Sequence, residues 1–170
     1  AILVLSKSSE SELITSDLIR PSKVRVLHNA VTVLADKDTI LKSENCGEVE
    51  RSFYCLCNYL PTKRIHNLVE IANQIPLPTF LFNGALPDEG YLTQLQNLDI
   101  HSLCSFDGVV NGEEKEARLN TSKAMVIPSL NEGMPLVILE SLAQATPVIC
   151  YDIGYISDYL GDDYPGLVKE

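Results

Sequence analysis

The stretch PSLNEGMPLVILESLAQATPVI, residues 128–149, decides the fold. It begins at the end of one apolar run and passes through a loop that contains Glu132 and Gly133. We predict a helix over 134–145, because Pro135 then lies in the first turn, where proline is tolerated. Short apolar runs on either side of this segment predict strands. The stretch is therefore a strand–loop–helix–strand unit.

The same alternation of short apolar runs and helical periods covers the rest of the chain. Further strands are predicted over residues 1–6, 23–29, 51–57, 78–84 and 101–108. Further helices are predicted over residues 9–18, 62–75, 87–98, 111–122 and 154–163. Strands that alternate with helices form βαβ units, whose parallel sheet is covered on both faces. We therefore predict an α/β fold with a doubly wound parallel sheet, interrupted by a connector over 32–51.

Composition limits the classes of partner. The chain has 170 residues, of which 45% are hydrophobic and 21% charged, and its formal net charge is −10. An acidic surface argues against nucleic acid and against an anionic membrane as partners. It does not exclude an anionic small molecule, because a local lysine or a helix N-terminus outweighs the global charge at short range. No apolar run approaches the roughly 20 residues of a membrane-spanning helix.

The five cysteines lie mostly in or beside apolar runs; they are Cys46, Cys55, Cys57, Cys104 and Cys150. A single C-x-C pair is poor zinc spacing, and the three histidines are scattered. We interpret the cysteines as buried free thiols in a reducing cytosol.

The loop before the predicted helix at 134–145 is a candidate anion site, because Gly133 lets a ligand approach the backbone and the first turn offers free N–H groups. Glu140 lies among apolar neighbours, where a carboxylate must reach water or find donors such as a ribose diol. Glu132 could then face a sugar beyond the phosphates. Alternatively, Glu140 belongs to an exposed polar stripe with Ser141 and Gln144, and Glu132 only complements the helix dipole.

Lys63 and Arg64 lie at the start of another predicted helix. Cations at that end oppose the helix dipole, so a bound diphosphate would explain them. They are equally well explained as two solvated surface charges.

Taken together, these residues resemble the signature of the group 1 glycosyltransferases, a family of retaining enzymes with two Rossmann-like domains, the GT-B fold. The resemblance rests on Pro128-Ser129, Glu132-Gly133-Met134-Pro135, Glu140 and Ala145-Thr146-Pro147-Val148-Ile149. It implies that the chain is one half of a GT-B architecture. Most of the chain shares the likeness, which is weakest at 31–50.

The resemblance implies a nucleotide-diphosphate-sugar donor. Lys63 matches the lysine that meets the diphosphate, and Glu132 matches the glutamate near the reacting centre, which gives it the catalytic role. Glu140 matches the glutamate that holds the ribose. The remaining donor-binding positions that the resemblance implies are Gly133, Met134, Pro135 and Leu136 around sugar and phosphates, and Gly84 and Val110 near base and ribose.

The chain departs from the family pattern at several of these positions. Asn58, which we keep in the donor-binding set, replaces an arginine, so one of two phosphate cations is lost. Cys57 and Ala30 replace glycines, and Arg64 and Ala145 are milder departures.

The resemblance also implies a division of the chain. Residues 1–28 match the end of an N-terminal acceptor domain and linker, and 29–170 match a nucleotide-sugar-binding domain truncated at its C-terminus. We expect a cytoplasmic enzyme that transfers a sugar to a glycan or lipid-linked acceptor in polysaccharide biosynthesis, with the inner membrane surface as the alternative location of the full-length enzyme. We expect no metal, no cofactor besides the sugar-nucleotide substrate, no direct membrane contact by this piece, and no catalysis by it alone.

Two other functions remain open. A nucleotide-sugar epimerase shares the two-domain architecture but usually lacks this Glu-to-Glu spacing. A degenerate nucleotide-binding or scaffold domain without catalysis would explain Asn58.

Overall fold

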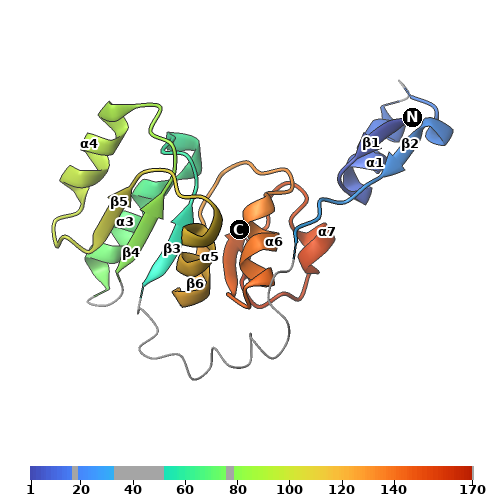
Figure 1. The fold of residues 1–170 in the computed structure, drawn as a ribbon. Helices are drawn as coiled ribbons and strands as arrows, with labels where there is room; N and C mark the ends of the chain where they lie inside the picture. Colours follow the sequence, from blue (N-terminus) through green and yellow to red (C-terminus); the bar gives the residue numbers. More distant parts are fainter. Residues whose placement is uncertain (17–18, 33–51, 76–78, 170) are drawn as a thin grey trace.

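A computed structural model describes residues 1–16, 19–32, 52–75 and 79–169. Its main body is a six-stranded parallel sheet in the order β5-β4-β3-β6-β7-β8 (Figure 1). The strands are β3 (Phe53–Leu56), β4 (Phe80–Asn83), β5 (Cys104–Asp107), β6 (Ala124–Ile127), β7 (Val148–Tyr151) and β8 (Leu167–Val168). The predicted α/β class with a doubly wound parallel sheet is confirmed. The strand β8 was not predicted.

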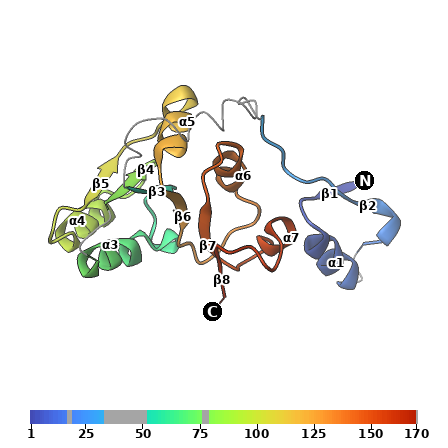
Figure 2. The same ribbon diagram turned by 90° about the horizontal axis from the view of Figure 1, so that it is seen from below.

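Helices cover both faces of this sheet. They are α3 (Ile65–Gln74), α4 (Glu89–Leu98), α5 (Gly112–Thr121), α6 (Leu136–Ala143) and α7 (Ser157–Leu160). In the view of Figure 2, α3 and α4 lie on one side of the sheet and α5 and α6 on the other. The start of α4 is set by Asp88, whose carboxylate accepts a hydrogen bond from the Gly90 N–H at 2.8 Å.

The core consists of two layers that follow the period-2 alternation of the strands. On β3, the Cys55 side chain packs against α3 and α4, whereas Tyr54 packs against the α5–α6 side. On β6, Val126 belongs to the first layer and Met125 to the second. The buried side chains of α3 recur at helical spacing; they are Ile65, Leu68, Val69 and Ala72. The apolar pattern therefore sets both the elements and the faces they bury.

The order in which strands are added to the sheet reverses between the two central strands, β3 and β6. From β3 it moves outward through β4 to β5, then returns to β6 on the other side of β3 and moves outward to β8. Such a reversal opens a crevice at the carboxyl ends of the two central strands, where ligands of doubly wound sheets bind.

Residues 1–16 and 19–28 form a separate small unit beside α7 (Figure 2). A two-stranded parallel sheet of β1 (Ile2–Val4) and β2 (Val24–Val26) is joined by α1 (Lys7–Thr15). Asp158 of α7 accepts hydrogen bonds from the backbone N–H of Ser8 at 3.0 Å and from its hydroxyl at 2.7 Å. The assignment of this unit to an acceptor domain stays a prediction.

Helix boundaries differ from the predicted ones at two loops. Lys63 ends a 3₁₀ turn over Pro61–Lys63, and Arg64 adopts a left-handed conformation (φ 52°) before α3 begins. Pro135 caps α6 with extended backbone instead of lying in its first turn. Both loops are thus longer than predicted, because a turn or an extended residue precedes each regular helix. Most of the predicted connector, residues 33–51, lies outside the described residues.

Four of the cysteines are described, and all are free thiols. Burial raises the pKa of Cys104 to about 12 and that of Cys150 to about 11, so both are neutral at physiological pH. Cys46 lies outside the described residues. Within the described residues, no helix has the length and apolar character needed to cross a membrane.

Candidate functional site

A cavity of about 190 Å³ lies at the switch point between β3 and β6. Cys57, Asn58 and Lys63 line it from the loop after β3, and Glu132 and Pro135 from the loop after β6. Three residues of the predicted donor-binding set, Asn58, Lys63 and Pro135, therefore share one cavity with the predicted catalytic Glu132, although two separate loops supply them.

An ion pair spans this cavity. Lys63 Nζ lies 2.6 Å from Glu132 Oε1, and the two side chains are 24% and 13% exposed, respectively. Asn58 is exposed and carries no charge. Among the described residues that line the cavity, Lys63 is the single cation.

Backbone contacts fix the loops that carry this pair. The Leu130 N–H donates to the Thr62 carbonyl at 3.0 Å and so ties the two loops together. A Cβ at Gly154 would overlap the Glu132 carbonyl oxygen, so the loop after β7 packs directly on the Glu132 backbone. Gly154 lacks this Cβ, which permits the close approach, and its φ of 59° is a conformation that glycine adopts without strain.

A second cavity, of about 250 Å³, lies between α5 and α6. Glu140 lines it, and its Oε1 lies 2.7 Å from Lys115 Nζ of α5. The Glu140 side chain is 28% exposed. It is therefore neither in the apolar core nor on a freely solvated stripe, because a lysine from the neighbouring helix holds it at a cavity wall.

The first turn of α6 separates the two cavities. Pro135 and Val137 line the cavity at the switch point, and Leu136 lines the one that contains Glu140. The Leu136 and Val137 N–H groups lack helical acceptors and present a partial positive charge, whereas the Ile138 N–H donates to the Pro135 carbonyl at 3.2 Å. An anion held there would lie between the two carboxylates.

The remaining predicted donor-binding positions differ in their contacts and in their exposure to solvent. The Met134 carbonyl accepts a hydrogen bond from Asn29 Nδ2 at 2.9 Å, while Gly133 is exposed with open space around its Cα. A Cβ at Gly84 would overlap the Cys57 carbonyl oxygen, so Gly84 supports the loop after β3. Val110 is buried. Neither Gly84 nor Val110 is among the described residues that line the two cavities.

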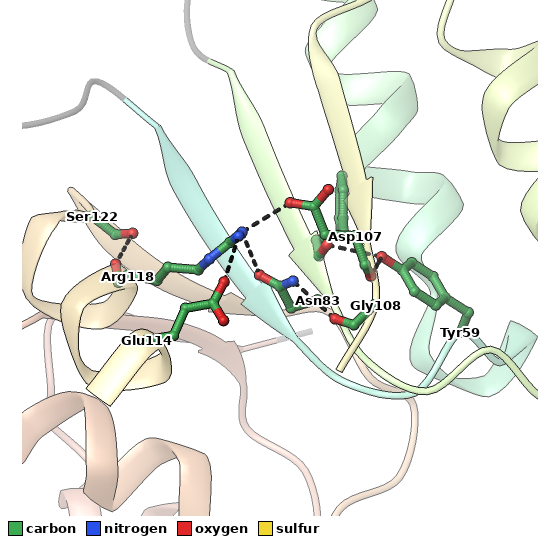
Figure 3. Close-up of polar contacts among 8 residues, drawn as sticks. Tyr59, Asn83, Asp107, Gly108, Glu114, Arg118 and Ser122 are labelled. Atoms are coloured by element: carbon green, nitrogen blue, oxygen red, sulfur yellow. Dashed lines mark hydrogen bonds and ion pairs between the residues drawn. The ribbon is translucent and has the colours of Figure 1, made fainter. Parts of the chain in front are cut away.

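A polar network at the ends of β4 and β5 was not predicted (Figure 3). Arg118 of α5 donates to Asn83 Oδ1 and Asp107 Oδ2, each at 2.9 Å, and to Glu114 Oε1 at 3.0 Å. Its hydrogen bond to Asp107 raises the pKa of Arg118 and keeps it charged. The Tyr59 hydroxyl lies 2.8 Å from the Asp107 carbonyl oxygen, and burial raises its pKa, so it stays protonated.

Part of this network had a signal in the sequence. Asn83 and Asp107 are polar residues at the ends of adjacent strands, and their Cα atoms are register partners. Polar groups at such ends meet at one sheet edge. Lys115 had no such signal, since it lies in a helix with many charged side chains.

A metal site has no evident ligand set. Within the described ranges, no group of three or more His, Cys, Asp or Glu side chains is placed to hold an ion. The expectation that no metal takes part stays a prediction.

Two curated glycosyl-transferring proteins are similar to this chain in sequence. The curated protein TuaC of Bacillus subtilis, provisionally named a teichuronic acid biosynthesis glycosyltransferase, is 34% identical over 92 residues, which are 54% of this chain and 22% of TuaC. The MMP α-(1→4)-mannosyltransferase of Mycolicibacterium hassiacum is 27% identical over 172 residues, with 95% of this chain and 39% of that protein covered. The chain thus spans less than half the length of these relatives.

A solved glycosyltransferase structure and a glycosyltransferase family model also match this chain. A crystal structure of a mutant of S. aureus TarM, in complex with fondaparinux, α-GlcNAc-glycerol and UDP, superposes with a TM-score of 0.79. It shares 18% identity, and the alignment covers 100% of this chain and 34% of TarM. The model of the family described as glycosyl transferases group 1 matches residues 36–170. The chain therefore belongs to the group 1 glycosyltransferases, a family of GT-B enzymes.

Proposed function

We propose that this chain is the donor-binding part of a retaining glycosyltransferase, which moves a sugar from a nucleotide-diphosphate sugar to a glycan or lipid-linked acceptor. The observation that carries the proposal is the cavity at the switch point, where Lys63 and Glu132 meet beside the start of α6. A lysine and a helix N-terminus form an anion site, and a carboxylate beside it can bind sugar hydroxyls.

The two cavities suit the parts of such a donor. The diphosphate lies between Lys63 and the first turn of α6, and the ribose reaches Glu140 in the second cavity. Glu132 faces the sugar. As the bond to the sugar breaks, negative charge grows on the departing diphosphate, and Lys63 and the helix N-terminus stabilise that charge.

Relatives support a nucleotide-sugar donor in general terms. TarM is similar in fold and was crystallised with UDP. The similar mannosyltransferase and TuaC are both named as glycosyl-transferring enzymes. None of these specifies the base, the sugar or the acceptor used by this chain.

We further propose that the acceptor binds to another domain and that this chain alone does not transfer a sugar. Large apolar side chains of the unit over residues 1–28 face solvent, among them Leu3 at 62% exposure and Leu27 at 59%. Such exposure suits a surface that continues into a larger core. We place the reaction in the cytoplasm, because the four described cysteines are free thiols, which suits a reducing compartment.

The proposal is tested by calorimetric titration of the chain with UDP, GDP and ADP. We expect one of them to bind, and we expect Glu140→Ala to weaken that binding. A folded protein that binds none of the three contradicts the donor-binding role.

One observation favours a second candidate, a domain that binds nucleotide or partners without catalysis. Asn58 lines the cavity at the switch point and supplies no charge to a diphosphate. If the chain proves folded but inert toward nucleotides, the partner-binding form of this candidate replaces the first.

A further inference from the structure

The ion pair at the switch point places two anions in competition for one cation. Lys63 Nζ is 2.6 Å from Glu132 Oε1, so its ammonium group is already engaged. A phosphate oxygen that enters the cavity needs the same group, because charge-assisted hydrogen bonds to an ammonium are the strongest contact available to it there. The ammonium group has three N–H donors and can contact both anions, but its single positive charge is then shared between them, so each anion weakens the contact of the other.

Because position 58 is occupied by an asparagine, the cavity has no second cation there for the phosphate. A second cation at that position could hold the phosphate while Lys63 stayed paired with Glu132. Its amide supplies no charge, and Lys63 is the single cation among the described residues that line the cavity. A diphosphate bound at Lys63 therefore draws on the charge that stabilises Glu132 and weakens the pair.

We propose that Glu132 competes with the diphosphate for Lys63, so that donor binding breaks the ion pair and releases Glu132 toward the sugar. This inference rests on the proposed function, since it assigns the diphosphate to this cavity. The arrival of the phosphate is then coupled to the orientation of the carboxylate that faces the sugar.

The exchange has a consequence for donor and product. With the intact donor, the released Glu132 carboxylate gains sugar hydroxyls in place of Lys63. With the product diphosphate no sugar is present, so the carboxylate loses its partner without replacement, which costs binding free energy. The ion pair therefore favours the donor over the product and assists product release.

The test uses inorganic pyrophosphate, which has neither base nor sugar, in calorimetric titrations at low ionic strength. We expect Glu132→Gln to bind pyrophosphate about two- to fivefold more tightly than the wild-type chain, the range that corresponds to a partly exposed ion pair. The matched control is Glu70→Gln, which removes the same charge from an exposed position on α3 outside the cavity. It should leave the affinity nearly unchanged.

Three results would overturn the inference. Glu132→Gln could bind pyrophosphate no more tightly than the wild-type chain, or Glu70→Gln could produce the same gain, which would reflect net charge alone. Absence of pyrophosphate binding by both the wild-type chain and Glu132→Gln at millimolar concentration would also overturn it. Should Glu132→Gln fail to fold, Glu132→Asp shortens the reach to Lys63 and should raise the affinity in the same direction.

Failure of the inference and failure of the proposed function give different results. If the wild-type chain binds a nucleoside diphosphate but Glu132→Gln gives no gain with pyrophosphate, only the competition is wrong. If no nucleoside diphosphate binds, the donor-binding role is wrong whatever pyrophosphate does.

Discussion

Glu132 and Glu140 lie eight positions apart in the same loop and helix, and each is paired with a lysine from another element. Glu132 lies in a loop, 13% exposed, at the switch point of the sheet. Glu140 lies in the second turn of α6, 28% exposed, against the neighbouring helix α5. The fold therefore gives two similar pairs different surroundings, one at a strand end and one between two helices.

These different surroundings indicate different roles for Lys63 and Lys115 in binding phosphate. Lys63 comes from a loop after a central strand and is the single cation among the described residues of its cavity. Lys115 comes from the helix α5, and its carboxylate partner Glu140 is more exposed than Glu132, at 28% against 13%. We expect Lys63 to make the larger contribution to the affinity for phosphate and Lys115 to make a smaller one.

The largest effect should follow from Lys63→Met. Loss of the cavity cation removes charge-assisted hydrogen bonds to the diphosphate, so the affinity for the nucleoside diphosphate should fall about 10- to 100-fold. Calorimetry measures it. Lys123→Met removes the same charge at an exposed position before β6 and serves as control. Equal losses in both variants would show that net charge, and not the cavity, controls binding.

Gly84→Ala should destabilise the loop after β3, which carries Lys63, and should leave the pair of Lys115 and Glu140 in place. The added Cβ would overlap the Cys57 carbonyl oxygen, so the free energy of unfolding should fall by about 1–3 kcal/mol. Urea denaturation measures this change. Gly133→Ala is the matched control, because no heavy atom lies within 4 Å of its added Cβ. If both variants unfold alike, the close approach at Gly84 is not the cause.

Glu140→Ala tests the second cavity. If its carboxylate holds the ribose diol, the variant should bind the nucleoside diphosphate about tenfold more weakly. The wild-type chain should also prefer this ligand to its 2′-deoxy form, and the variant should lose that preference. A preference that survives in the variant would place the ribose elsewhere.

The smallest effect should come from Lys115→Met. Its pair with Glu140 is partly exposed, so the affinity for the nucleoside diphosphate should change by less than about fivefold. The same titration measures it. A loss as large as that of Lys63→Met would erase the distinction between the two pairs and show that Lys115 itself holds phosphate.

The sequence could predict most of the sheet, because each core strand is a short apolar run between helical periods. It could not predict β8, since Leu167–Val168 is only two residues long and depends on Gly166, where a Cβ would overlap the Val148 carbonyl oxygen. Such close backbone approaches leave no periodic pattern in the sequence.

The site could be predicted only in part. The rule that ligands bind at strand ends places Lys63 and Glu132 near each other. That these residues pair with each other depends on loop conformations, including the left-handed Arg64 and the extended Pro135. The contacts of Arg118 with Asn83 and Asp107 depend on sheet register, and those of Lys115 on the packing of α5 against α6.

The most direct test of the central claim is a map of backbone amide chemical shifts in the labelled chain during titration with UDP, GDP and ADP. The account predicts that at least one of them shifts signals clustered at residues 57–63 and 132–137, on both sides of the switch point. A folded chain whose signals stay unchanged with all three, or change only away from these loops, would contradict it.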